Sequence, residues 1–369
     1  MKAMLKTILS FSVIAIIVGC CNREGELHYK TEKFCMMPDF EKGYAQGVSA
    51  CYAVATDDAL YIAGGCNFPV TPAAEGGEKV YYKGIYRIAT NGQGEWQQIA
   101  ELPEESAYGA CMQHGEDLII AGGMNSNGAL DKVYSINLAT MQIEELPSLP
   151  CTMDNLAGTI AGETLYVVGG NVNGKASNKV FSLELHKDST WKELTPFPGA
   201  ARVQPVCAHA KGGIYVWGGF TPAVEGNEAA VHCDGVRYDI ATGNWEYAGS
   251  INAQRGNITL SGGIAAAFDE NSIVAVGGVD KEIFLDAISG TYSIVKKEEY
   301  MHKPSNWYRF NSELLIYDAV NKNWETIVND SAYARAGAQL AIQNGKIYLI
   351  GGELKPGIRT PEIHQISMN

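Results

Sequence analysis

One short pattern, repeated six times, most constrains how this chain can fold. An apolar run ends in a pair of glycines at positions 64–65, 122–123, 169–170, 218–219, 277–278 and 351–352. After most copies an aromatic residue and then a tryptophan follow, as in Tyr86 with Trp96, Phe181 with Trp191, Tyr238 with Trp245 and Tyr317 with Trp324. A short apolar run bounded by glycine is typical of a buried strand. Each copy therefore predicts a small antiparallel sheet.

Such a sheet cannot bury its own faces, but several sheets can do so by stacking around a common axis. The repeat resembles the kelch repeat, whose period is roughly 50 residues. Six copies predict an all-β fold, a six-bladed kelch-type β-propeller, and one propeller over residues 27–369 accounts for the length without a second domain. Few residues follow the sixth glycine pair, so the segment Leu27 to Cys35 is expected to complete the last blade. Residues 279–310 are expected to form a partly helical insertion over one face.

The first residues are typical of a targeting signal. Residues 9–18 form an apolar stretch that is too short to span a bilayer. It ends in Ile17-Val18-Gly19-Cys20, which resembles the bacterial lipobox. We expect a lipoprotein signal peptide at 1–19, a lipidated Cys20 and a linker at 20–26; the alternative is an ordinary secretory signal. Either one predicts that the mature protein leaves the cytoplasm. With the lipoprotein signal we expect a periplasmic or cell-envelope location, with membrane contact only through an N-terminal lipid anchor.

The charge balance narrows the class of partner. The chain has 28 basic and 41 acidic residues, which gives a formal net charge of −13 at pH 7. Binding to a phosphate backbone needs a basic surface, so nucleic acid is not expected as a partner. The nine cysteines and seven histidines show no spacing typical of a metal site. No metal ion and no cofactor are predicted.

Polar residues next to the inner strands predict where a binding site would lie. In a four-stranded blade, residues after a glycine pair share a face with residues before the first strand. Asn67 follows the first pair, and Arg202, Arg255 and Arg335 precede three successive first strands. Guanidinium groups around a cavity suit a carboxylate ligand, so these four residues are candidates for substrate binding. The alternative for each arginine is a pair with an acid of a neighbouring blade.

The last loop carries the most specific pattern, Gly351-Gly-Glu353-Leu-Lys-Pro-Gly-Ile-Arg359-Thr. It resembles the Gly-Glu-x-Lys-Pro-Gly-x-Arg-Thr segment of N-acetylneuraminate epimerases, also called sialic acid mutarotases. Asn67-Phe-Pro and Gly277-Gly-Val-Asp280 resemble two further segments of that family, although the family often has Asn where Asp280 stands. Here Asn-Phe-Pro precedes the Lys-Pro-Gly-x-Arg loop, whereas better-known members have the reverse order. The chain therefore resembles the cyclically permuted branch of the family.

The resemblance implies a function and two catalytic residues. The protein would interconvert the α and β anomers of the sugar acid N-acetylneuraminate, with Glu353 as the base and Arg359 holding the sugar carboxylate or stabilising developing negative charge. The alternative is that Glu353 is a strand-end acid and Arg359 its salt-bridge partner. Because the core strands lie elsewhere in the chain, substitution of either residue is expected to leave the melting temperature almost unchanged. One alternative is a non-catalytic kelch propeller that binds a glycan or a protein. Another is a copper radical oxidase, which the scattered histidines disfavour.

Overall fold

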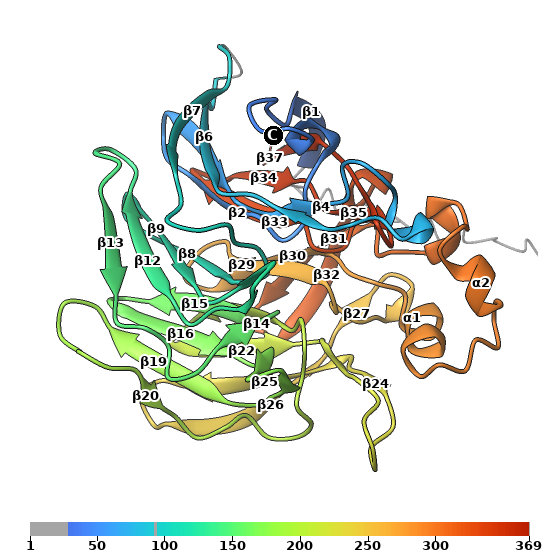
Figure 1. The fold of residues 1–369 in the computed structure, drawn as a ribbon. Coiled ribbons are helices and arrows are strands. Elements are labelled where there is room, and N and C mark those ends of the chain that lie inside the picture. The colour runs from blue at the N-terminus through green and yellow to red at the C-terminus, as the bar shows by residue number, and fades with distance from the viewer. Residues whose placement is uncertain (1–28, 92–93, 369) are drawn as a thin grey trace, which may run out of the picture.

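A computed structural model describes residues 29–91 and 94–368 (Figure 1). Cys20, the signal peptide and the linker lie outside the described residues. Within them, six four-stranded antiparallel sheets follow one another along the chain. The first three comprise β2 (Tyr52–Ala55), β3 (Ala59–Ala63), β6 (Gly84–Ala89) and β7 (Gln97–Glu101); β8 (Ala110–His114), β9 (Asp117–Ala121), β12 (Val133–Asn137) and β13 (Ile143–Leu146); and β15 (Ala157–Ala161), β16 (Thr164–Val168), β19 (Val180–Glu184) and β20 (Lys192–Glu193). The next three comprise β21 (Val206–Ala210), β22 (Gly213–Trp217), β25 (Asp234–Asp239) and β26 (Asn244–Ser250); β29 (Gly263–Ala267), β30 (Ser272–Gly277), β31 (Glu313–Asp318) and β32 (Asn323–Asn329); and β33 (Gln339–Gln343), β34 (Lys346–Ile350), β37 (Glu362–Met368) and β1 (Tyr29–Met36).

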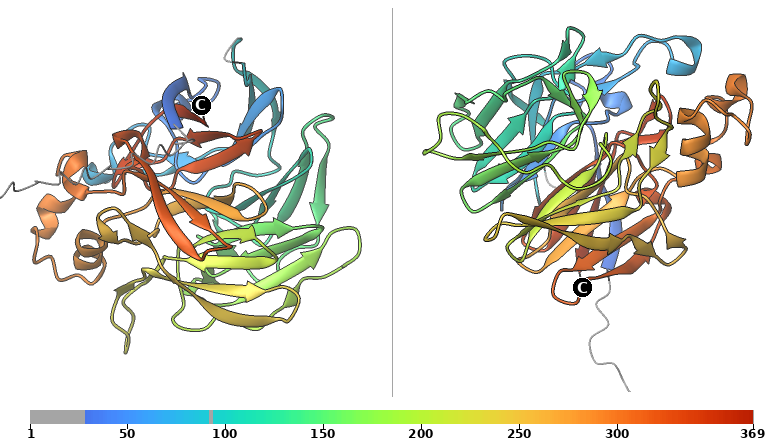
Figure 2. Two further views of the ribbon diagram at one scale, coloured as in Figure 1. Left: turned by 180° about the vertical axis from the view of Figure 1, so that it is seen from behind. Right: turned by 90° about the horizontal axis from the view of Figure 1, so that it is seen from below.

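Each predicted apolar run is the second strand of a sheet. Every residue of β3 and of β22 is buried, whereas the outermost strands β7 and β20 are largely exposed. The second strands are apolar on both faces because neighbouring sheets cover both of them. Six hydrophobic clusters each join two sheets, and one of them packs Tyr348 and Ile350 of the last sheet against Leu60 and Ile62 of the first. The all-β prediction is confirmed, and the arrangement is that of a β-propeller (Figures 1 and 2).

The two ends of the described chain meet in one sheet. β1 pairs with β37 from Tyr29 opposite Met368 to Met36 opposite Glu362. The predicted place of the N-terminal segment in the last sheet is therefore confirmed. This pairing covers the edge of β37 that would otherwise be open.

Six backbone hydrogen bonds connect the innermost strands around the axis. Each sheet has one residue with a positive φ, between 51° and 67°, shortly before its first strand. These residues are Ala50, Tyr108, Asn155, Gln204, Gly262 and Gly337. We call them the axial ring. The N–H of each donates to the carbonyl of the ring residue in the preceding sheet, at 2.7–3.4 Å, and the N–H of Ala50 donates to the carbonyl of Gly337. Each bond satisfies a backbone group at a sharp turn.

The paired glycines let the next sheet approach closely. Gly64 and Gly351 have φ values of +58° and +56°. A Cβ atom on Gly64 would lie 2.4 Å from the carbonyl oxygen of Ser106, and one on Gly351 would lie 2.4 Å from that of Val48. Only glycine fits this combination of backbone conformation and contact, which explains the repeated pattern.

Short elements carry the loops at one end of the sheets. Two-stranded and three-stranded ladders comprise β4 (Cys66–Asn67), β5 (Val80–Tyr81), β10 (Met124–Asn125), β11 (Gly128–Ala129), β14 (Met153–Asp154), β17 (Asn171–Val172), β18 (Lys175–Ala176), β23 (Phe220–Thr221), β24 (Ala230–Val231), β27 (Asn252–Ala253), β28 (Gly256–Asn257), β35 (Glu353–Lys355) and β36 (Ile358–Arg359). The helical turns are η1 (Tyr44–Gln46), η2 (Ala73–Glu75), α1 (Lys281–Ile288), α2 (Lys297–Tyr300), η3 (Ser305–Tyr308) and η4 (Ser331–Tyr333). α1, α2 and η3 lie within residues 279–310, so the helical insertion is confirmed, and Figure 2 shows it outside the sheets. Among the described residues, no helix has the length and apolar character needed to cross a membrane.

Candidate active site

Glu353 and Arg359 face each other across a tight hairpin. β35 and β36 pair in a register that places Glu353 opposite Arg359. Pro356 and Gly357 form the turn, and Gly357 has a φ of +82°, the value that a type II turn requires at its third residue. The Arg359 Nη2 lies 2.5 Å from the Glu353 Oε1. The spacing of Glu353 and Arg359 in the motif thus places the two residues opposite each other in a hairpin, where they form an ion pair.

The ion pair is largely withdrawn from water. The Arg359 side chain is 2% exposed and the Glu353 side chain is 22% exposed. Burial raises the pKa of Glu353, and the charges of Arg359 and Lys79 oppose part of that rise. Burial is the largest single influence on the pKa of Arg359 and lowers it, but Glu353, Cys66 and Tyr108 together outweigh burial, so that this pKa is raised. Glu353 is therefore a stronger base than an exposed glutamate.

Each partner keeps one polar atom without a hydrogen bond to the described protein. The Arg359 Nε donates to the Ser49 Oγ at 3.1 Å, while its buried Nη1 has no partner among the described residues. The Glu353 Oε1 is held by Arg359. Within the described part of the chain, Glu353 Oε2 is in no hydrogen bond or ion pair. The carboxylate is thus fixed at one oxygen and able to accept a proton at the other.

Aromatic rings of the first two sheets adjoin this pair. The Arg359 guanidinium lies 4.8 Å from the centre of the Phe68 ring, and the Lys79 Nζ lies 5.7 Å from the same centre. Lys79 also donates a hydrogen bond of 3.2 Å to the Tyr108 hydroxyl. The β4–β5 hairpin pairs Asn67 with Val80, which brings the adjoining Phe68 and Lys79 together.

The helical insertion forms a further side of the site. The Lys355 Nζ donates to the carbonyl oxygens of Met301 at 3.4 Å and Lys303 at 2.9 Å, and β35 contacts η3 (Figure 1). Burial raises the pKa of Tyr300, and the Glu353 charge adds to that rise. The Tyr300 side chain therefore lies close enough to Glu353 for the Glu353 charge to affect its pKa.

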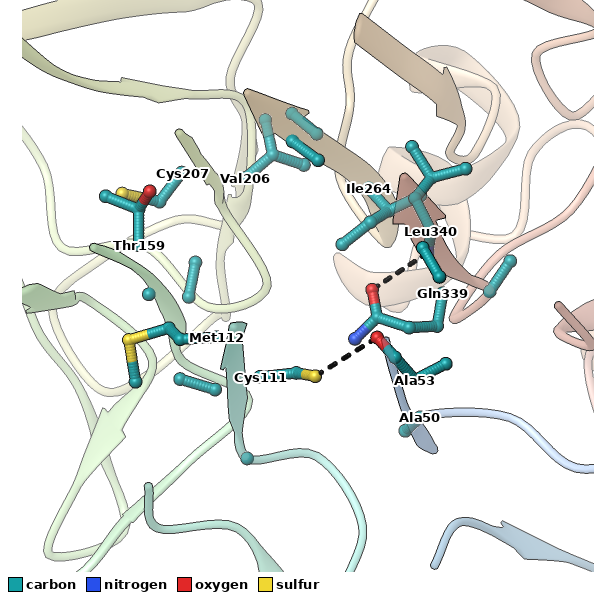
Figure 3. Close-up of a pocket in the computed structure, with 18 of the residues that line it drawn as sticks. Ala50, Ala53, Cys111, Met112, Thr159, Val206, Cys207, Ile264, Gln339 and Leu340 are labelled. Atoms are coloured by element: carbon teal, nitrogen blue, oxygen red, sulfur yellow. Dashed lines mark hydrogen bonds between the residues drawn. The ribbon is translucent and has the colours of Figure 1, made fainter. Parts of the chain in front are cut away.

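A central cavity of about 630 Å³ lies between the innermost strands β2, β8, β15, β21, β29 and β33 (Figure 3). Its lining contains no Asp, Glu, Lys, Arg or His among the described residues. Burial raises the pKa of the Cys111 thiol in this lining to about 12, so the thiol stays protonated at neutral pH. Tyr108 belongs to the axial ring, lines the cavity and bonds Lys79. Tyr108 therefore links the lining of the cavity to Lys79, whereas Glu353 and Arg359 do not line the cavity.

Comparison with known proteins identifies the family of this chain. A family model described as N-acetylneuraminate epimerase matches residues 146–369, a stretch that contains the whole Glu353–Arg359 hairpin. This chain belongs to the N-acetylneuraminate epimerase family. Relatives with the name N-acetylneuraminate epimerase include those of Pasteurella multocida (31% identical over 245 residues, 63% of this chain and 61% of the relative), Salmonella arizonae (32% over 230 residues, 60% and 58%) and Haemophilus influenzae (32% over 228 residues, 59% and 58%). The matched part thus spans about three fifths of the length of these relatives.

The sequence predicts that Asn67 binds substrate, but in the structure its side chain forms its hydrogen bonds within the protein. It is 2% exposed. Its Nδ2 donates to the carbonyl oxygens of Gly43 and Gly47, each at 2.8 Å, and its Oδ1 accepts a 2.8 Å hydrogen bond from Tyr82. These bonds hold the Asn-Phe-Pro loop and leave no amide hydrogen of Asn67 for a ligand.

Arg202 and Arg335 are also engaged inside the protein. Each is 2% exposed. Arg202 Nη1 donates to the carbonyl of Gly218, and Arg335 Nη1 donates to that of Gly351, so both bind the first glycine of their own sheet's pair. Arg202 also pairs with Asp234 at 2.7 Å. The acid lies in the same sheet, so the alternative of a pair with a neighbouring blade is not what the structure has.

Arg255 and Asp280 form hydrogen bonds with residues within or next to the helical insertion at residues 279–310. Arg255 is exposed and bonds the Asn311 amide oxygen and the Arg309 carbonyl. Asp280 caps α1 by accepting from the backbone N–H of Glu282 and of Ile283. The structure therefore brings Glu353 and Arg359 together, while none of the hydrogen bonds of Arg202, Arg255 or Arg335 reaches that pair.

Sequence reasoning missed Lys79 and gave no role to Phe68, Tyr108 and Tyr300. Lys79 comes directly after none of the six glycine pairs that end an apolar run, and it precedes no first strand, so the repeat did not mark it. Lys79 lies beside Phe68 because the Asn-Phe-Pro segment pairs with the strand after it. Only the register of β4 with β5 in the structure reveals this pairing.

Proposed function

We propose that this protein catalyses the exchange of the α and β anomers of N-acetylneuraminate. The observation that carries the proposal is the Glu353–Arg359 ion pair, mostly buried and presented by a hairpin whose sequence resembles the family's motif. The names of the relatives support the same substrate. A propeller that only binds a partner has no need for a carboxylate with a raised pKa and a free oxygen.

The reaction needs one proton acceptor and one proton donor. Glu353 Oε2 takes the proton of the anomeric hydroxyl as the bond from the anomeric carbon to the ring oxygen breaks. The ring oxygen takes a proton from the Tyr108 hydroxyl, which burial keeps protonated because it raises the pKa of that group. The open-chain keto acid then turns its carbonyl, and closure on the other face returns both protons. Arg359 keeps Glu353 ionised between turnovers.

The remaining predicted residues have supporting roles in this proposal. Asn67, Arg202 and Arg335 hold the loops that carry the site, because their hydrogen bonds go to backbone carbonyls and to Asp234. Arg255 anchors the insertion through Asn311.

The test is an NMR time course of freshly released α-N-acetylneuraminate with and without the protein. We expect exchange to the β anomer faster than in buffer, in proportion to protein concentration. If the protein binds the sugar without accelerating exchange, the non-catalytic binding propeller is the better description.

We propose further that the six sheets are the blades of one closed, cyclically permuted kelch-type propeller. The axial ring of six hydrogen bonds and the six inter-sheet clusters support closure. The family match begins at residue 146 although the sheets begin at Tyr29, and a changed blade order gives such a partial match. An experimental structure of this chain with five or seven blades would contradict this.

The location of the protein is proposed from the sequence alone. Residues 1–20 carry the lipobox pattern, and we propose that the mature protein begins at a lipidated Cys20 in the cell envelope. Mass spectrometry of the mature N-terminus tests this, and cleavage at another residue would refute it.

A further inference from the structure

Lys79 lies close enough to Glu353 for its charge to act on that carboxylate, and it forms no ion pair with a described acid. Arg359 is already bound to Glu353 at 2.5 Å and to Ser49. Lys79, in contrast, forms no ion pair with any described residue, and its side chain donates a hydrogen bond to the neutral Tyr108 hydroxyl. A cation in such surroundings is able to bind an anion without breaking an existing ion pair.

The structure fixes where the Lys79 ammonium lies. Its Nζ lies 4.9 Å from the centre of the Tyr108 ring and 5.7 Å from that of Phe68. Contacts of this kind stabilise a cation at a defined position. The β4–β5 hairpin fixes the backbone on one side, through the pairs Cys66 with Tyr81 and Asn67 with Val80. The position of the ammonium is therefore built into the first sheet.

The position of this ammonium matches the shape of the substrate class. In a 2-keto sugar acid, the anomeric carbon carries the carboxylate, the anomeric hydroxyl and the ring oxygen. The base, the proton donor and a carboxylate anchor must therefore lie close together. Lys79 is near enough to Glu353 for its charge to act on that carboxylate, and it touches Tyr108 directly.

We infer that Lys79 binds the carboxylate of the sugar acid, so that Arg359 stays paired with Glu353 during the reaction. This inference rests on the proposed substrate, and it assigns the carboxylate to a residue outside the Glu-x-Lys-Pro-Gly-x-Arg motif. The Asn-Phe-Pro segment then has a function, because its Phe68 ring contacts both Arg359 and Lys79. Asp154 also approaches the site near Tyr81, but its Oδ1 accepts from the Asn155 and Asn171 amides.

The experiment measures equilibrium binding of two probes, N-acetylneuraminate and its methyl ester, which lacks the negative charge. Wild type is compared with Lys79→Met, Lys79→Gln and Lys79→Arg. Lys83→Met is the matched control, since Lys83 belongs to the same first-sheet region and pairs with the exposed Glu101 at 2.6 Å. Isothermal titration calorimetry gives each dissociation constant.

We expect wild type to bind the acid more tightly than the ester. Lys79→Met and Lys79→Gln should weaken binding of the acid by about 10- to 100-fold, the value of a hydrogen bond to a charged group, and leave binding of the ester nearly unchanged. Lys79→Arg should retain most of the affinity for the acid, and Lys83→Met should change neither probe.

Equal loss for both probes, or no loss for the acid, in folded Lys79→Met or Lys79→Gln would overturn the inference. The same holds if wild type binds acid and ester equally well. Tight, Lys79-dependent binding of the acid without faster anomer exchange would instead refute the proposed reaction and keep the carboxylate site. Binding of neither probe to wild type would refute both.

Discussion

Replacing Glu353 with glutamine tests the proposed base and the cost of breaking a buried ion pair together. The amide keeps the shape of the side chain and can still accept a hydrogen bond from Arg359, but it cannot take a proton. Loss of a general base costs about 10²–10⁴-fold in rate, so anomer exchange in Glu353→Gln should fall towards the spontaneous rate.

The ion pair changes the expectation, drawn from the sequence alone, that substitution of Glu353 leaves the melting temperature almost unchanged. Removing one partner of a buried pair costs about 3–5 kcal/mol, but here the amide oxygen still accepts a hydrogen bond and Glu353 is 22% exposed. We therefore expect about 1–3 kcal/mol of destabilisation. With an unfolding entropy of about 2.1 cal/mol/K per residue, the melting temperature of a chain of this length should fall by about 1–4 °C.

The assay combines the NMR time course with thermal unfolding of the same preparation. Glu362→Gln is the control, because Glu362 lies in β37 and pairs with Lys33 at 2.9 Å, with both side chains at least 40% exposed. Such exposed pairs contribute about 0–1 kcal/mol, so this variant should keep both its activity and its melting temperature. Near-normal exchange in Glu353→Gln would show that Glu353 is not the base. An unchanged melting temperature would show that Arg359 does not depend on its counter-charge.

Four further predictions follow from particular contacts. Arg359→Met removes a charge that lowers the pKa of Glu353, so the acid limb of the kcat/KM profile should move to higher pH. If the limb does not move, the charge of Arg359 does not act on the carboxylate that controls the rate. Asn67→Ala loses three buried hydrogen bonds and should lower the free energy of unfolding by about 1–3 kcal/mol, as chemical denaturation can measure; a change in substrate affinity with intact stability would restore Asn67 as a ligand residue. Deleting β1 (Tyr29–Met36) exposes the edge of β37, and light scattering should then detect aggregation that a wild-type preparation lacks. Burial lowers the pKa of His232 to about 4, below its unfolded value, so the unfolded state takes up the proton first and stability should fall as pH drops from about 6.5 towards 4; melts of His232→Gln should show a flatter dependence over that window, and an identical slope would count against the assignment.

Much of the fold could be predicted because its signals are local. The apolar runs and glycine pairs mark the second strand of every sheet, since a strand covered on both faces must be apolar throughout. The Glu353–Arg359 pair could be predicted from the family motif, and a hairpin with Pro356 and Gly357 at its turn brings its ends together without help from the rest of the chain.

Only the tertiary structure decided the roles of the arginines and of Lys79. Arg202 and Arg335 resemble ligand-binding residues in the sequence, but folding brings the carbonyl oxygens of Gly218 and Gly351 to their guanidinium groups. Lys79 shows no pattern in the sequence, and it becomes part of the site because one hairpin register sets it beside Phe68 and Tyr108. Sequence periodicity reports which residues are buried, because burial follows strand geometry. It cannot report which donor meets which acceptor, because those partners come from distant segments that meet only when the sheets pack.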